Sequence, residues 1–230
     1  VQLIVSKTII ELPLAIVKSQ RKNMARSVLD SAFVDSTNQE FNVDNNYNKP
    51  VVGIDRDGVL NVDLGTYVTS PEYFQPIPNS LEAVALLRSK GHRIAVITNQ
   101  GGIEKGLMTP SDVDQVHNKM LEMLGQAGCP SIDAIYYSAS SRKNDMYAKP
   151  NIGMFKRCEK EHPYIKFSKG FFVGDKLSDL KAAHKMGARP ILVRTGHGLE
   201  TEKQLNKHAY KQIKKQTLVF DNLWEFAQAL

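Results

Sequence analysis

The sequence predicts an α/β protein in which a mainly parallel, Rossmann-like sheet is flanked by helices. Short apolar runs rich in β-branched residues, which are typical of strands buried on both faces, alternate with segments of helical length. Residues that start or stop helices stand at the ends of those segments. Strands separated by helices of this length pair in parallel through right-handed crossovers.

Each predicted element rests on a local signal. The strands are expected over residues 51–54, 93–97, 132–137, 170–173, 191–193 and 218–220. The helices are expected over residues 80–90, 110–125, from about 150 onward, and 178–186. Asn79 or Ser80 can cap the first helix. Thr109 precedes a proline in the first turn of the second, and Gly187 stops the last.

Composition divides the 230 residues into an N-terminal extension and linker, residues 1–48, and a main α/β domain, residues 49–230. The extension ends in an asparagine-rich stretch typical of linkers. No apolar run approaches the ~20 residues that cross a bilayer. The most apolar stretch of the extension contains Glu11 and lacks the small-residue cleavage site of a secretory signal peptide. We therefore expect a cytoplasmic protein without a membrane partner, as a monomer or weak homo-oligomer.

The formal net charge of +6 suits an anionic small molecule, but it also suits nucleic acid. Part of the excess lies in lysines predicted to fall along one side of a helix near the C-terminus: Lys203, Lys207, Lys211, Lys214 and Lys215. No aromatic residues alternate with them to stack on bases. A solvated helix face is the favoured interpretation, and no nucleic-acid partner is expected.

Two carboxylates, Asp55 and Asp57, follow the first predicted strand. Such a pair can serve one metal ion and one reaction. One carboxylate attacks phosphorus, and the other protonates the leaving oxygen and later activates water. Taken alone, the pair is better explained by a turn that caps the strand.

Polar residues also follow the next three predicted strands. Thr98 begins a Thr-Asn-Gln-Gly-Gly stretch whose hydroxyl and backbone N–H groups can cradle phosphate oxygens. Lys149 would lie beside a helix N-terminus that favours anions. Asp175 and Asp179 can complete an oxygen-ligand shell for Mg²⁺. Each feature alone has an ordinary structural explanation. Together, at the C-terminal ends of successive parallel strands, they indicate one active site.

This ordered set resembles the haloacid dehalogenase superfamily of phosphohydrolases over roughly residues 50–197. The resemblance implies that superfamily's fold without a large cap domain, and a Mg²⁺-dependent phosphatase that forms a phospho-aspartate. It makes Asp55 the nucleophile and Asp57 the general acid and base, while Thr98 and Lys149 hold phosphoryl oxygens. The implied Mg²⁺ ligands are Asp55, Asp57 through its backbone carbonyl, Asp175 and, in support, Asp179.

Longer stretches look like the D,D-heptose 1,7-bisphosphate 7-phosphatase branch, which is related to the histidinol-phosphate phosphatases. They include residues 55–61, 98–103, 149–154 and 173–179. The resemblance implies a small phosphorylated metabolite as substrate. The residues expected to touch it are Asp63, Thr66, Tyr67, Asn99, Gln100, Gly101 and Lys176.

Two departures from that branch alter the expectation. The branch carries a zinc loop of four cysteine or histidine ligands, where this chain has Ser138, Ser140, Asp145 and Tyr147. These side chains are a poor tetrahedral Zn²⁺ set, so no zinc is expected. Ala148 also replaces an arginine that the branch uses in substrate recognition. Modest selectivity for the bisphosphate is therefore expected, unless Arg142 or Lys143 supplies the missing charge.

Three other functions remain open from the sequence. One is a histidinol-phosphate or other sugar-phosphate phosphatase. Another is a polynucleotide 3′-phosphatase, because that group carries a similar second motif. The last is a non-catalytic scaffold that binds a phosphorylated ligand, although a pure binding module has no need of two catalytic aspartates.

Overall fold

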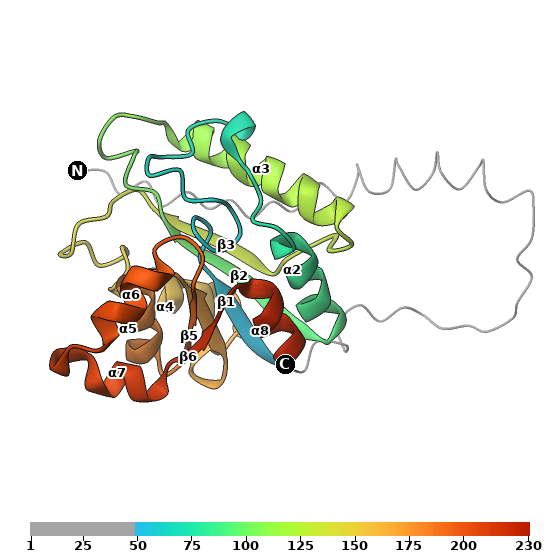
Figure 1. Cartoon of the computed structure of the whole chain (residues 1–230). Coiled ribbons are helices and arrows are strands. Elements are labelled where there is room, and N and C mark those ends of the chain that lie inside the picture. The colour runs from blue at the N-terminus through green and yellow to red at the C-terminus, as the bar shows by residue number, and fades with distance from the viewer. Residues whose placement is uncertain (1–48) are drawn as a thin grey trace, which may run out of the picture.

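The computed structural model describes residues 49–230, and the predicted extension, residues 1–48, lies outside the described residues. Six strands form one sheet in the order β3-β2-β1-β4-β5-β6, and every neighbouring pair is parallel (Figure 1). The strands are β1 (Lys49–Ile54), β2 (His92–Asn99), β3 (Ala134–Ser138), β4 (Phe171–Gly174), β5 (Arg189–Val193) and β6 (Leu218–Phe220). The predicted α/β class and parallel sheet are confirmed.

Helices cover both faces of the sheet (Figure 1). They are α2 (Ser80–Ser89), α3 (Pro110–Gln126), α4 (Gly153–Glu161), α5 (Leu177–Met186), α6 (Gly198–Leu205), α7 (Lys211–Gln216) and α8 (Leu223–Ala229). Short 3-10 turns occupy Pro71–Tyr73, Phe167–Lys169 and His208–Tyr210. No helix within residues 49–230 is both long and apolar enough to span a membrane.

Strand alternation divides the core into two layers, because successive side chains of a strand point to opposite faces. Val52 and Ile54 of β1 pack with α2, α3 and α8 on one face. Val51 of β1 belongs to the other layer, together with apolar residues of α4 and α5. This burial on both faces explains why the central strands read as continuous apolar runs.

The C-terminal part differs from the sequence prediction. Its lysines do not lie along one helix, because α6 ends at Leu205 and a separate α7 starts at Lys211. Lys207 between them has an extended backbone (φ −69°, ψ 139°), which breaks the helical run. The single helix expected through these lysines is thus two helices, and α8 was not expected. The third strand begins at Ala134 instead of 132, and α4 begins at Gly153, after the expected position.

A stability test of the layer formed by α4 follows from its aromatic packing. The Phe155 ring is fully buried, and its centroid lies 5.0 Å from that of Phe167 and 4.8 Å from that of Phe172. We expect Phe155→Ala to lower the free energy of unfolding by about 3–5 kcal/mol, because it leaves a cavity. Urea unfolding measures this. Tyr73→Ala removes an exposed ring and should change stability by only about 0.5 kcal/mol. Equal effects of the two changes would contradict the described packing.

Candidate active site

Lys149 lies at the centre of a buried polar cluster at the C-terminal edge of the sheet. Its ammonium nitrogen is 2.9 Å from Asp55 Oδ1 and 2.8 Å from Asp179 Oδ1. It also donates a hydrogen bond to the backbone carbonyl of Ile97 at 2.8 Å. Burial acts to lower the pKa of Lys149, but the carboxylates of Asp179 and Asp55 outweigh it and raise that pKa. The side chain is therefore a buried cation.

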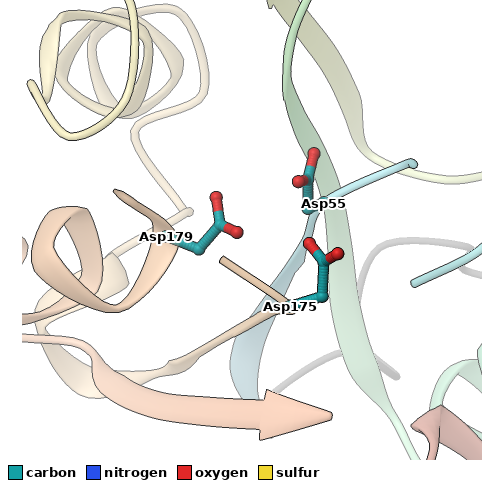
Figure 2. Close-up of side chains that lie close together, drawn as sticks. All are labelled: Asp55, Asp175 and Asp179. Atoms are coloured by element: carbon teal, nitrogen blue, oxygen red, sulfur yellow. The ribbon is translucent and has the colours of Figure 1, made fainter. Parts of the chain in front are cut away.

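Three buried carboxylates converge beside this lysine from separate elements. Asp55 follows β1, Asp175 follows β4, and Asp179 lies in the first turn of α5. Figure 2 shows their side chains directed toward one another. One oxygen from each lies within 4.8 Å of the others, and this is the only group of three such side chains among residues 49–230 that could hold a metal ion.

The charge balance of these carboxylates fits a divalent cation. Burial, and then the nearby Asp179 and Asp55, raise the pKa of Asp175 to about 8. Burial likewise raises the pKa of Asp55, despite the opposing effect of Lys149. Asp175 Oδ1 is buried without a hydrogen-bond partner in the described part of the chain. An oxygen-seeking cation such as Mg²⁺ would satisfy that atom and relieve the repulsion.

Asp179 already uses both of its oxygens within the protein. Oδ1 pairs with Lys149, and Oδ2 accepts from the backbone N–H of Lys176 at 2.9 Å. Beyond that ion pair, Oδ1 has no hydrogen-bond partner in the described part of the chain, so Asp179 could also face an ion held by the three carboxylates.

Two glycines allow loops to close around Asp175. Gly58 (φ 89°) and Gly196 (φ 56°) both have left-handed backbone conformations. A Cβ atom at either position would overlap Asp175 Oδ2. The same oxygen accepts a hydrogen bond from the backbone N–H of His197 at 2.8 Å. The site therefore needs glycine at both positions for space as well as for conformation.

Asp57, the second aspartate of the motif, is held by the side chain of Arg56. The guanidinium donates through Nε to Asp57 Oδ1 at 3.0 Å and through Nη2 to Oδ2 at 2.8 Å. Gln100 Nε2 donates to Asp57 Oδ2 and to Thr98 Oγ1, each at 3.0 Å. Burial acts to raise the pKa of Asp57, but Arg56 and Gln100 outweigh it and lower that pKa. The two motif aspartates thus lie in different electrostatic environments.

Asn99 and Gln100, both predicted to touch substrate, are engaged inside the protein. The Asn99 amide donates to the backbone carbonyl of Lys149 at 3.0 Å and accepts from its N–H at 2.9 Å. Gln100 is buried between Arg56, Asp57 and Thr98. In this structure the two amides orient Lys149 and Asp57.

The other predicted substrate contacts have more varied positions. Lys176 pairs with Asp63 at 2.9 Å, and His197 Nε2 lies 3.2 Å from the same carboxylate oxygen. Tyr67 is half-buried below the ammonium of Lys105, and its neighbour Thr66 is exposed. Gly101 lies so close to Ser141 that a side chain at 101 would collide with it.

The loop between β3 and α4 is held by hydrogen bonds at the positions compared with a zinc loop. Ser138 Oγ donates to the backbone carbonyl of Ser140, whose own Oγ donates to Glu104. Asp145 Oδ1 accepts from the backbone N–H groups of Tyr147 and Ala148.

Ala148 and Arg142 differ sharply in their exposure. The methyl group of Ala148 is fully buried, so a larger side chain there would have to displace its neighbours. The Arg142 side chain is 69% exposed, and its Nε lies 2.6 Å from a Glu104 oxygen. Arg142 and Lys143 are therefore both accessible cations of this loop.

Sequence reasoning missed the roles of Arg56 and His117. Arg56 stands between the two predicted aspartates and was given no role, although a charged residue next to a buried strand is itself a signal. His117 lies in the middle of α3, and nothing local distinguishes it from an ordinary core histidine.

Comparisons with known proteins agree with this geometry. A HAD-hydrolase-like family model matches residues 146–226. The D-glycero-beta-D-manno-heptose-1,7-bisphosphate 7-phosphatase of Pseudomonas aeruginosa is 34% identical over 177 residues, which cover 77% of this chain and 95% of that protein. The corresponding phosphatase of Chlorobaculum tepidum is 37% identical over 166 residues, covering 66% of this chain and 81% of the relative.

A solved structure is similar over nearly its whole length. It is the crystal structure of D,D-heptose 1,7-bisphosphate phosphatase from B. bronchiseptica in complex with magnesium and phosphate. The TM-score is 0.70 at 31% identity, and the match covers 79% of this chain and 97% of that one.

The raised pKa of Asp175 predicts a pH-dependent stability in metal-free protein. Its ordinary value is 3.8 and its value in the folded protein is about 8, so between these values the folded state holds a proton that the unfolded chain releases. The stabilising contribution is full below the lower value and is lost as pH rises through the higher one. The loss can reach about 1.4 kcal/mol per pH unit.

Urea unfolding in EDTA at about pH 5 and about pH 8 checks this prediction. Wild-type protein should lose more stability between the two than Asp175→Asn, whose amide does not titrate. Titrating groups outside the triad are common to both proteins and cancel in the comparison. Equal losses would show that Asp175 is not strained by its neighbours.

Proposed function

The chain belongs to the HAD-like hydrolases, the phosphatase family that includes the heptose bisphosphate 7-phosphatases, and on that premise we propose that it hydrolyses a sugar phosphate through phospho-Asp55 with Mg²⁺. One observation carries the proposal. Lys149 lies between Asp55 and Asp179, which form a buried triad of carboxylates together with Asp175. The proposed substrate is D-glycero-D-manno-heptose 1,7-bisphosphate or a similar phosphorylated sugar. Support for this choice comes from the names of the relatives.

The proposed mechanism assigns each residue one task. Asp55 would attack phosphorus, and Asp57 would protonate the departing sugar oxygen. Water would then attack the phospho-aspartate and give its proton to Asp57, which releases inorganic phosphate and restores Asp55. Lys149 would hold the phosphoryl oxygens throughout the reaction. Thr98, whose oxygen accepts from Gln100, would donate its hydroxyl proton to another phosphoryl oxygen.

The residues present fit a magnesium ion. Asp55, Asp175 and the backbone carbonyl of Asp57 would hold it, with Asp179 in support. When bound, the ion supplies positive charge to the phosphoryl oxygens and to the carboxylate cluster. Zinc is not part of the proposal, because Ser138, Ser140, Asp145 and Tyr147 make a poor ligand set.

Substrate recognition is proposed for residues outside the cluster of Lys149 and the three carboxylates. Asp63, Thr66, Tyr67, Gly101 and Lys176 would contact the sugar or its second phosphate. Asn99 and Gln100 would act mainly by orienting Lys149 and Asp57. Arg142 is the candidate for the charge that is missing at Ala148. Because every site residue lies within 49–230, this segment is proposed as the catalytic unit.

A substrate panel with a nucleophile variant tests the proposed function. With Mg²⁺, wild-type protein should release phosphate from sugar phosphates with a higher kcat/KM than from histidinol phosphate or a 3′-phosphorylated oligonucleotide. Asp55→Asn should lower kcat by about a thousandfold or more, because an amide cannot attack phosphorus. Asp221→Asn changes an exposed carboxylate and serves as the matched control. No phosphate release from any ester would sink the proposal.

Metal replacement tests the proposed cofactor separately. EDTA should stop turnover, and Mg²⁺ alone should restore it, because oxygen ligands and a phosphate substrate suit that ion. Metal analysis of the purified protein should find no stoichiometric zinc. Zinc at one equivalent, or activity that survives EDTA, would contradict the proposed cofactor.

A further inference from the structure

Arg56 is a buried cation with acceptors on three separate segments. Its side chain is fully buried. Besides its two bonds to Asp57, Nη2 donates to Gln100 Oε1 at 3.0 Å, and Nη1 lies 3.3 Å from His117 Nε2. These contacts join the loop after β1, the loop after β2 and the middle of α3.

His117 anchors this guanidinium from behind. The ring is completely buried and faces a permanent cation, so it is neutral, and Nε2 accepts a hydrogen bond from Arg56. Burial first, and then Arg56, lower the pKa of His117 to about 3, in agreement with that assignment. The ring proton must then lie on Nδ1, which is buried without a hydrogen-bond partner in the described chain. The hydrogen bond from Arg56 to Nε2 therefore leaves the N–H group at Nδ1 of His117 without an acceptor.

The arrangement is difficult to explain by stability alone. A buried ion pair often stabilises a fold no better than apolar side chains of similar volume. Here the ion pair also requires a neutral histidine with an unsatisfied nitrogen and a glutamine that makes three contacts. What the arrangement does provide is a fixed orientation, because a guanidinium fork constrains both oxygens of a carboxylate.

The contacts of Asp57 distinguish its two oxygens. Oδ2 accepts from Arg56 at 2.8 Å and from Gln100 at 3.0 Å, which fills its two lone-pair directions. Oδ1 accepts from Arg56 at 3.0 Å and, over a longer distance of 3.4 Å, from Asn61 Nδ2. The Asn61 amide makes a shorter bond of 2.8 Å to the backbone carbonyl of Val62. Oδ1 is therefore the oxygen with the weaker second hydrogen bond, which another donor can replace more easily.

We propose that Arg56, fixed by Gln100 and His117, is a positioning residue that presents Oδ1 of Asp57 to the water that hydrolyses the phospho-enzyme. The inference rests on the proposed function and deepens it. In this step the water oxygen forms a bond to phosphorus while the bond between phosphorus and the Asp55 oxygen breaks. Asp57 Oδ1 takes the water proton, and inorganic phosphate leaves.

The reaction has two steps, formation of the phospho-enzyme and its hydrolysis. An aryl phosphate such as p-nitrophenyl phosphate allows the two to be measured separately. Its leaving group departs as a stable anion, so phospho-enzyme formation needs little help from an acid, whereas hydrolysis of the phospho-enzyme still needs a base. In Arg56→Met we expect phospho-enzyme hydrolysis to slow about tenfold or more, while its formation from the aryl ester changes less than about threefold. Acid quenching at successive times measures the rate of phospho-enzyme formation. A chase with unlabelled ester after labelling measures the rate of its hydrolysis.

A double variant covers the case in which Arg56→Met does not fold. Arg56→Met/Asp57→Asn leaves no unpaired carboxylate behind. Because Arg56 acts through Asp57, the double variant should hydrolyse phospho-enzyme within about twofold of Asp57→Asn alone. Arg157→Met, which removes a partly exposed guanidinium paired with Glu161, should change neither half-reaction.

Two results would overturn the inference. One is a parallel loss of both half-reactions in Arg56→Met, which is the behaviour of a merely structural residue. The other is a further large loss when Arg56 is removed from Asp57→Asn. Failure of the proposed function looks different, because wild-type protein would then form no phospho-enzyme at all.

Discussion

The ammonium of Lys149 is the constraint on which the rest of the site depends. Three carboxylates lie buried at one edge of a sheet, and without a cation among them they would repel one another or take up protons. Lys149 pairs with two of them. Its own position is fixed by Asn99 at its backbone and by the carbonyl of Ile97 at its tip. The C-terminal edge of a parallel sheet brings these segments together.

Two buried cations divide the two motif aspartates between them. Lys149 contacts Asp55, whose pKa is raised because burial outweighs the effect of the paired charge. Arg56 donates two hydrogen bonds to Asp57, whose pKa is lowered. Neighbouring carboxylates with pKa values shifted in opposite directions can perform different tasks. A cation bound to the triad would favour the ionised form of Asp55, so the same chain can keep a nucleophile and a proton acceptor side by side. Sequence spacing alone gives no hint of this division.

Local patterns predicted most of what depends on local physics. The β-branched runs placed all six strands, and the rule for parallel sheets brought Asp55, Thr98, Lys149 and Asp175 to one edge. Prediction failed where the determining contact is distant in sequence. His117 meets Arg56 across 61 positions, and Asn99 reaches Lys149 across 50. The division of the C-terminal lysines between α6 and α7 depends on the backbone at Lys207, which the three-to-four spacing of the lysines does not reveal.

The central claim is that the cluster around Lys149 forms and stabilises a phosphoryl group on Asp55. A crystal structure with Mg²⁺ and beryllium trifluoride, which imitates an aspartyl phosphate, tests it most directly. The account predicts the trifluoride on an oxygen of Asp55, with Lys149 and Thr98 at its fluorines and the metal on Asp175. A trifluoride bound to another residue, or a metal that leaves Asp175 without a ligand contact, would contradict it.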